Sequence, residues 1–148
     1  MSCPSFQGMR YHPWRHARDL DIAIEFVPNL RARATYSAGL IQIRAGLSQR
    51  ERRAAVAHEI VHYERGDDGV ACSRWHLQKL ERQVHLEAAR RLITIEDLAD
   101  AVIGEPDYPC MAQKLWVDDY TFRLRLAYVS DEEREQIQHL CPSEWRIA

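Results

Sequence analysis

The order of apolar and polar positions predicts strands in the first third of the chain. From residue 21, apolar side chains alternate with polar or small ones, and this period of two is typical of a half-buried strand that Pro28 and Asn29 end. Two further short strands are expected on either side of the turn pair Ala38-Gly39. Because tight links join neighbouring strands most simply, residues 21–27, 32–36 and 40–43 predict a small three-stranded antiparallel sheet.

Helical patterns follow the strands. Ser48 and Glu51 form an S-x-x-E capping box, and Gly66 is typical of the position just after a helix end, so a helix is expected from Gln49 to Arg65. Residues 1–20 show no clean period and are expected to form a loop or a short helix. The later helical segments are residues 74–93, about 95–104, 111–116, 120–129 and 132–140. Strands followed by helices predict the α+β fold class.

One domain is expected over residues 1–148, with the sheet and the site helices in residues 21–93 and a helical C-terminal subdomain in residues 94–148. Cys3, Cys72, Cys110 and Cys141 form no CxxC pair and are expected to be free thiols. No apolar run approaches the roughly 18 residues of a membrane span, and the N-terminus lacks the apolar segment of a secretory signal. We therefore expect a cytoplasmic protein without membrane contact, and the net charge of −2 gives no general attraction to nucleic acid.

One short motif carries recognisable chemistry, the HExxH sequence His58-Glu59-Ile60-Val61-His62 within the helix expected at residues 49–65. Positions i and i+4 share a helix face, so both imidazoles can reach one zinc ion at about 2.0–2.1 Å per nitrogen. Glu59 lies about 100° around the helix, where it can reach a water on the ion rather than the ion itself. This pattern is typical of peptide hydrolysis by metal-activated water, with the glutamate as general base.

A catalytic zinc needs a third protein ligand and one open position. On the helix expected at residues 74–93, one stripe (positions 77, 81, 84, 88 and 92) is apolar except at Glu81. A carboxylate on such a stripe is costly unless it is paired or metal-bound, which ranks Glu81 first. His85, one turn later, is an alternative ligand or a residue that orients one. Glu87 ranks third because it has polar neighbours, and Asp67 and Asp68 are further candidates.

These segments resemble the ImmA/IrrE family of zinc metallopeptidases. The stretches ERRAAVAHEIVHYERGD and ERQVHLEAARRLI are similar to the HExxH helix of the family and to its following E-x-x-A-(D/N)-x-x-A-x-x-L-(L/I) motif, and the resemblance extends over roughly residues 20–130. It implies a zincin-like fold, Zn²⁺ held by His58, His62 and Glu81, and Glu59 as catalytic base. His85 stands where the family has Asp or Asn.

Members of this family are intracellular peptidases with narrow substrates, and several cut helix-turn-helix repressors of phage, mobile-element or stress genes. The resemblance therefore implies a protein substrate in the cytoplasm of a bacterial host, with a transcriptional repressor as the expected partner. Because His85 departs from the family motif, a shifted pairing of that motif with this sequence stays open, and in that pairing Glu87 is the third ligand. Tyr36 or Tyr63 could stabilise an oxyanion in a peptidase, and the sequence does not choose between them.

Two alternatives belong to other functional classes. Residues 111–129 can form a helix-turn-helix with Arg123 and Arg125 on its second helix, but Asp118 and Asp119 stand where phosphate would approach. We therefore expect packed helices there and no direct nucleic-acid binding. The chain could also be a non-catalytic module with a metallopeptidase-like fold that regulates a partner by gripping it. The intact Glu59 argues against that alternative, because a module that only binds is free to lose its base.

Overall fold

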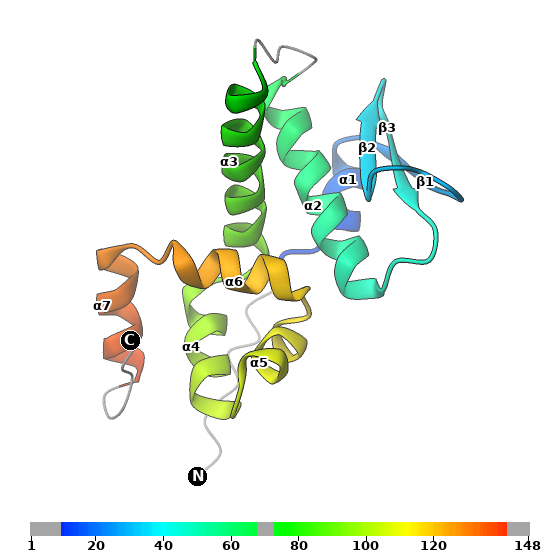
Figure 1. The fold of residues 1–148 in the computed structure, drawn as a ribbon. Helices are drawn as coiled ribbons and strands as arrows, with labels where there is room; N and C mark the ends of the chain where they lie inside the picture. Colours follow the sequence, from blue (N-terminus) through cyan, green and yellow to red (C-terminus); the bar gives the residue numbers. More distant parts are fainter. Residues whose placement is uncertain (1–9, 68–72, 142–148) are drawn as a thin grey trace.

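The structure is a computed structural model that describes residues 10–67 and 73–141 of the 148-residue chain. Within these ranges it is an α+β fold with seven helices and one three-stranded sheet. Figure 1 shows how these elements are arranged. The strands are β1 (Ala23–Val27), β2 (Ala34–Ser37) and β3 (Leu40–Arg44). The helices are α1 (Pro13–Asp19), α2 (Gln49–Arg65), α3 (Arg74–Leu92), α4 (Ile95–Gly104), α5 (Tyr108–Leu115), α6 (Asp119–Ala127) and α7 (Asp131–Leu140).

Among the described residues, no helix has the length and apolar content that a membrane crossing requires. Cys110 and Cys141 are free thiols, in agreement with the expectation. Cys3 and Cys72, together with the candidate ligand Asp68, lie outside the described residues.

Helix α2 has the bounds that its sequence predicts, and local chemistry explains both ends. The Ser48 hydroxyl accepts a hydrogen bond from the Glu51 N–H at 3.2 Å, and the Glu51 carboxylate accepts one from the Ser48 N–H at 2.8 Å. Gly66 ends the helix in the left-handed conformation (φ 68°), which glycine adopts without the steric cost of a Cβ. Interactions within a few residues therefore determine where the HExxH helix begins and ends.

Helix α5 begins at Tyr108 rather than at the expected Met111. The Asp107 side chain accepts a hydrogen bond from the Cys110 N–H at 2.8 Å and so caps the helix. Pro109 lies in the first turn, where its missing N–H leaves no helical hydrogen bond unmade. Pro106 and Pro109 favour a loop when only the sequence is considered, but in the structure they are compatible with the start of a helix.

The sheet is mixed, and the prediction of an antiparallel sheet was wrong. The strand order is β1-β3-β2, with β3 parallel to β1 and antiparallel to β2. Ala38 and Gly39 both have positive φ (48° and 79°), and they make the tight hairpin between β2 and β3. The longer link at residues 28–33 carries β2 to the outside, so the hairpin returns β3 between β1 and β2. Alternating side chains predict a half-buried strand, but they do not determine the direction of its partner.

Helix α2 is packed between two hydrophobic clusters. Val56 and Ile60 belong to the cluster with the sheet and α1, whereas Ala57 and Val61 belong to the cluster with α3 and the C-terminal helices. The middle of α2 is therefore buried on two sides, between the sheet and α3 (Figure 1). On α3, the apolar stripe expected from the sequence does not reach its first position, because Leu77 is 42% exposed.

Arg125 on α6 is buried rather than presented to solvent. Its side chain is 2% exposed, its Nε donates to the Ile93 carbonyl oxygen at 3.0 Å, and its two terminal nitrogens donate to the Glu133 carboxylate at 3.1 and 2.8 Å. The bidentate ion pair with Glu133 connects α6 with the start of α7, and the hydrogen bond to Ile93 connects α6 with the end of α3. Arg125 is therefore not placed to contact the phosphates of DNA.

We expect Glu133→Gln to lower the free energy of unfolding by about 2 kcal/mol, because the buried Arg125 would lose its counter-charge. The hydrogen bonds from Arg125 lower the pKa of Glu133. The stabilisation is therefore fully present above the unfolded-state pKa of about 4.3 and is lost as the pH falls through the lower folded-state pKa. Urea unfolding of the wild type and of Glu133→Gln at pH 7 and pH 3 measures this difference in the free energy of unfolding. Equal losses in Glu133→Gln and in the exposed control Glu135→Gln would contradict the assignment.

Candidate metal centre

The HExxH helix α2 and helix α3 lie side by side (Figure 1). Three of their side chains converge at one point. His58 and His62 lie one turn apart on α2, and Glu81 faces them from α3. The His58 Nε2 atom is 3.0 Å from Glu81 Oε2, and the His62 Nε2 atom is 3.0 Å from Glu81 Oε1. The two Nε2 atoms are 3.1 Å apart. The residues ranked first in the sequence therefore converge.

The spacing of these atoms suits a metal ion. Donors at about 2.0–2.1 Å from a tetrahedral ion lie about 3.3 Å from one another. The two Nε2 atoms are 3.1 Å apart, and each lies 3.0 Å from a different oxygen of the Glu81 carboxylate, which is close to that value. Two imidazole nitrogens and one carboxylate are also the donors that zinc takes in catalytic sites. These residues fit Zn²⁺ both in donor type and in spacing.

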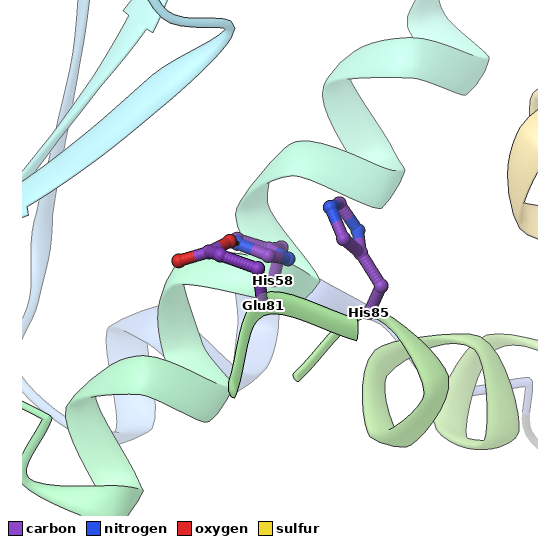
Figure 2. Close-up of side chains that lie close together, drawn as sticks. All are labelled: His58, Glu81 and His85. Carbon is purple, nitrogen blue, oxygen red and sulfur yellow. Dashed lines mark ion pairs between the residues drawn. The ribbon is translucent and has the colours of Figure 1, made fainter. Parts of the chain in front are cut away.

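His85 lies beside this group on α3, as Figure 2 shows. Its ring centroid is 4.0 Å from that of His58, and donor atoms of His58, Glu81 and His85 all lie within 4.8 Å of one another. These three residues are thus a second group that could hold an ion, but the donors of the group with His62 are closer together. Burial lowers the pKa of His85 to about 4, and the neighbouring His58 acts in the same direction. The His85 ring is therefore neutral at pH 7.

Glu59 is buried next to the convergent donors, with 8% of its surface exposed. Burial raises the pKa of Glu59, whereas the charges of His58 and His62 and a hydrogen bond from the Tyr36 backbone N–H oppose that rise. A carboxylate whose pKa is raised by burial accepts a proton more readily than an exposed one does, and it can release that proton again. This is the property that a general base needs.

Asp67 supports His62 from the side away from Glu81. Its Oδ2 atom is 3.3 Å from His62 Nδ1 and 3.2 Å from Arg65 Nε. Asp67 thus contacts the ring nitrogen that does not face Glu81, so it orients His62 instead of joining the three donors. The Nδ1 atom of His58, by contrast, is buried and has no hydrogen-bond partner among the described residues.

We expect Asp67→Ala to weaken zinc binding by about 10- to 100-fold, because the His62 ring would lose the partner that fixes its orientation. Competition with a chromophoric chelator measures the affinity. The matched control is Asp19→Ala, which removes an exposed carboxylate on α1. Similar affinities for the two variants would show that Asp67 does not act on the metal site.

Glu87, the ligand of the shifted pairing, is directed away from these donors. Its Oε1 atom is 3.2 Å from Arg91 Nε on the same helix, and Arg91 also pairs with Glu64 of α2 at 2.6 Å. Glu87 therefore belongs to an ion-pair network between α2 and α3. The geometry places Glu81, and not Glu87, beside the two HExxH histidines.

The convergent donors line a cleft of about 560 Å³. Strand β2 with the residues before it forms one wall, and parts of α2, α3 and α6 form the others. Tyr36 lines this cleft, where its hydroxyl accepts a hydrogen bond from the Gly39 N–H at 3.2 Å. Tyr63 packs edge-on against Tyr36 and is not part of the lining. Of the two tyrosines that the sequence leaves open, Tyr36 is the one at the cleft.

Four further residues of the cleft could not be identified as site residues from the sequence: Arg33, Asp118, Tyr120 and Thr121. Tyr120 on α6 packs edge-on against His85 with 5.2 Å between ring centroids. Arg33 Nη1 is 3.0 Å from Asp118 Oδ2, and the Thr121 hydroxyl donates to the same carboxylate. This ion pair joins the segment before β2 to the start of α6. No local pattern reveals these residues, because packing of distant elements brings them to the site.

Three features therefore meet in one cleft: side chains of the types that hold a divalent ion, the buried Glu59 carboxyl group beside them, and a wall formed by the edge strand β2. Comparison of the chain with protein-family models, with curated proteins and with solved structures found no match.

Proposed function

We propose that the chain is a zinc-dependent endopeptidase with a zincin-like active site, as its resemblance to the ImmA/IrrE family implies. One observation carries the proposal: the donor atoms of His58, His62 and Glu81 converge within 3.1 Å in a cleft that Glu59 also lines. Zinc held there would polarise a peptide carbonyl and lower the pKa of a water molecule.

The protein residues have separate roles in this proposal. His58, His62 and Glu81 hold the ion, and Asp67 orients His62. Glu59 takes the proton from the attacking water and then gives it to the leaving nitrogen, so the same carboxyl group serves both halves of the hydrolysis. Its burial supports this role, because burial raises the pKa and lets the carboxyl group hold a proton between the two transfers.

The substrate binds as an extended segment along β2. This strand is at the edge of the sheet and pairs only with β3 among the described strands. Apart from the Tyr36 N–H, which donates to Glu59, its outer backbone groups can therefore pair with another chain. Residues 32–36 also line the cleft. A strand added there would pass beside Glu59 and the three donors. The resemblance makes a helix-turn-helix repressor in a bacterial cytoplasm the expected substrate, with no direct contact between this chain and DNA.

Zinc analysis and a cleavage assay test the proposal. Elemental analysis of the purified protein should find about one zinc per chain, and His58→Ala should lose it. The zinc-loaded protein should cut a repressor encoded beside its gene at a defined bond. Mass spectrometry identifies the fragments, a chelator should stop their formation and added zinc should restore it. Zinc content that does not differ from that of His58→Ala would overturn the proposal.

A further inference from the structure

A second cavity, of about 290 Å³, lies at the N-terminal half of α2, between α1, β1 and the end of α5. None of its lining residues also lines the metal cleft. Aromatic side chains from three separate elements contribute to it: Trp14, Phe26 and Trp116. The cavity therefore needs an explanation other than catalysis at the metal centre.

Two of these aromatic side chains are unusually exposed. Phe26 is 48% exposed and Trp116 is 52% exposed, although side chains of this size usually bury most of their surface. Trp116 also ends α5 with a left-handed backbone (φ 60°), a conformation that glycine or asparagine usually supplies at this position. Arg53 holds it there by donating to the Trp116 carbonyl oxygen at 3.1 Å. A strained backbone that keeps a large aromatic residue at a cavity is typical of a binding site.

The cavity also contains an arginine without an anionic partner. The Arg52 guanidinium lies over the Phe26 ring, 4.8 Å from its centroid, and its Nε atom is buried without a hydrogen-bond partner. Its side chain makes no ion pair with any other described residue, and no Asp or Glu lines the cavity. Arg53 differs, because it donates to the carbonyl oxygens of Leu115, Trp116 and Tyr11. Among the described residues of the cavity, Arg52 is therefore the arginine whose guanidinium is not already engaged by backbone carbonyl oxygens and can pair with a ligand.

We propose that this cavity binds a peptide segment of a partner protein in which one carboxylate lies next to a bulky apolar side chain. The carboxylate pairs with the guanidinium of Arg52, and the apolar side chain packs between Phe26 and Trp116. One available guanidinium suits one carboxylate, whereas a nucleic-acid backbone needs several cations. This site does not require the proposed peptidase activity, so either proposal can fail while the other holds.

Tryptophan indole N–H signals in a heteronuclear NMR titration test the site. The probe is the capped peptide Ac-Glu-Leu-Phe-NH₂, and its matched control is Ac-Gln-Leu-Phe-NH₂. The acidic peptide should shift the signals of Trp14 and Trp116 and leave that of Trp75, on α3, unchanged. The control peptide should bind at least about tenfold more weakly, which is the loss of one charge-assisted hydrogen bond.

Variants separate the charge from the aromatic walls. Arg52→Gln should lower the affinity for the acidic peptide about tenfold and remove the difference between the two peptides. Phe26→Ser should abolish binding of both, while an unchanged circular dichroism spectrum shows that the fold persists. Three results would overturn the proposal: equal affinities of the wild type for both peptides, no shift at millimolar peptide, or shifts caused by a thymidine oligonucleotide and not by the acidic peptide.

Discussion

Glu59→Gln should leave the fold and the zinc content unchanged and reduce peptide hydrolysis by at least about 10³-fold. Glutamine has nearly the same shape, so the packing around this buried position persists. Its amide does not accept a proton from water near neutral pH, so the attacking water loses its base. Parallel measurements of bound zinc, of the circular dichroism spectrum and of the rate of repressor cleavage check all three expectations.

The matched control is Glu25→Gln, which neutralises an exposed carboxylate on β1 and should cleave at the wild-type rate. The Glu59 variant also distinguishes an enzyme from a module that regulates its partner by binding alone. If Glu59→Gln still relieves repression as well as the wild type does, then binding and not hydrolysis is the function, and the peptidase proposal is wrong.

Glu81→Ala should weaken zinc binding by more than about 100-fold, a larger loss than that expected for a residue that only orients a ligand. Among the described residues, this carboxylate is the acidic group that contacts both HExxH histidines, with one oxygen 3.0 Å from each Nε2 atom. Hydrogen bonds from the two histidines hold the pKa of Glu81 well below its usual range, so the carboxylate is ionised at pH 7. Chelator competition measures the change.

Two variants serve as comparisons for Glu81→Ala. Glu87→Ala removes a carboxylate from the same helix that pairs with Arg91 instead, and it should keep near wild-type affinity. Zinc lost in Glu87→Ala and kept in Glu81→Ala would support the shifted pairing. His85→Ala examines the group formed by His58, Glu81 and His85. A loss of zinc in His85→Ala as large as that in Glu81→Ala would show that His85 is a ligand.

The sequence predicts the parts of the fold that depend on near neighbours. The bounds of α2 follow from a capping box at Ser48 and a left-handed Gly66, both within a few residues of the helix. His58 and His62 are placed together by the helical repeat alone. The apolar stripe on α3 that singles out Glu81 is only partly predicted by local pattern. Val84, Ala88 and Leu92 are buried as expected, whereas Leu77 is exposed.

Features that depend on distant contacts could not be predicted in the same way. The parallel pairing of β1 with β3 follows from the route of residues 28–33, which alternation does not describe. Arg125 has the sequence appearance of a surface cation, but tertiary packing buries it against Glu133. Tyr120 and Asp118 reach the cleft only because α6 packs against α3. Neither the composition nor the local spacing of residues predicts contacts between elements that are far apart in the sequence.

The two-sided packing of α2 limits how the metal cleft can adapt to a substrate. A helix enclosed by the sheet cluster and by the C-terminal cluster cannot tilt or slide without separating both from their partners at once. The imidazoles of His58 and His62 are thus attached to a helix that is packed on both sides. Any change in cleft width must come from the outer walls, β2 and α6, and the Arg33–Asp118 ion pair that joins them has to yield before the walls can part.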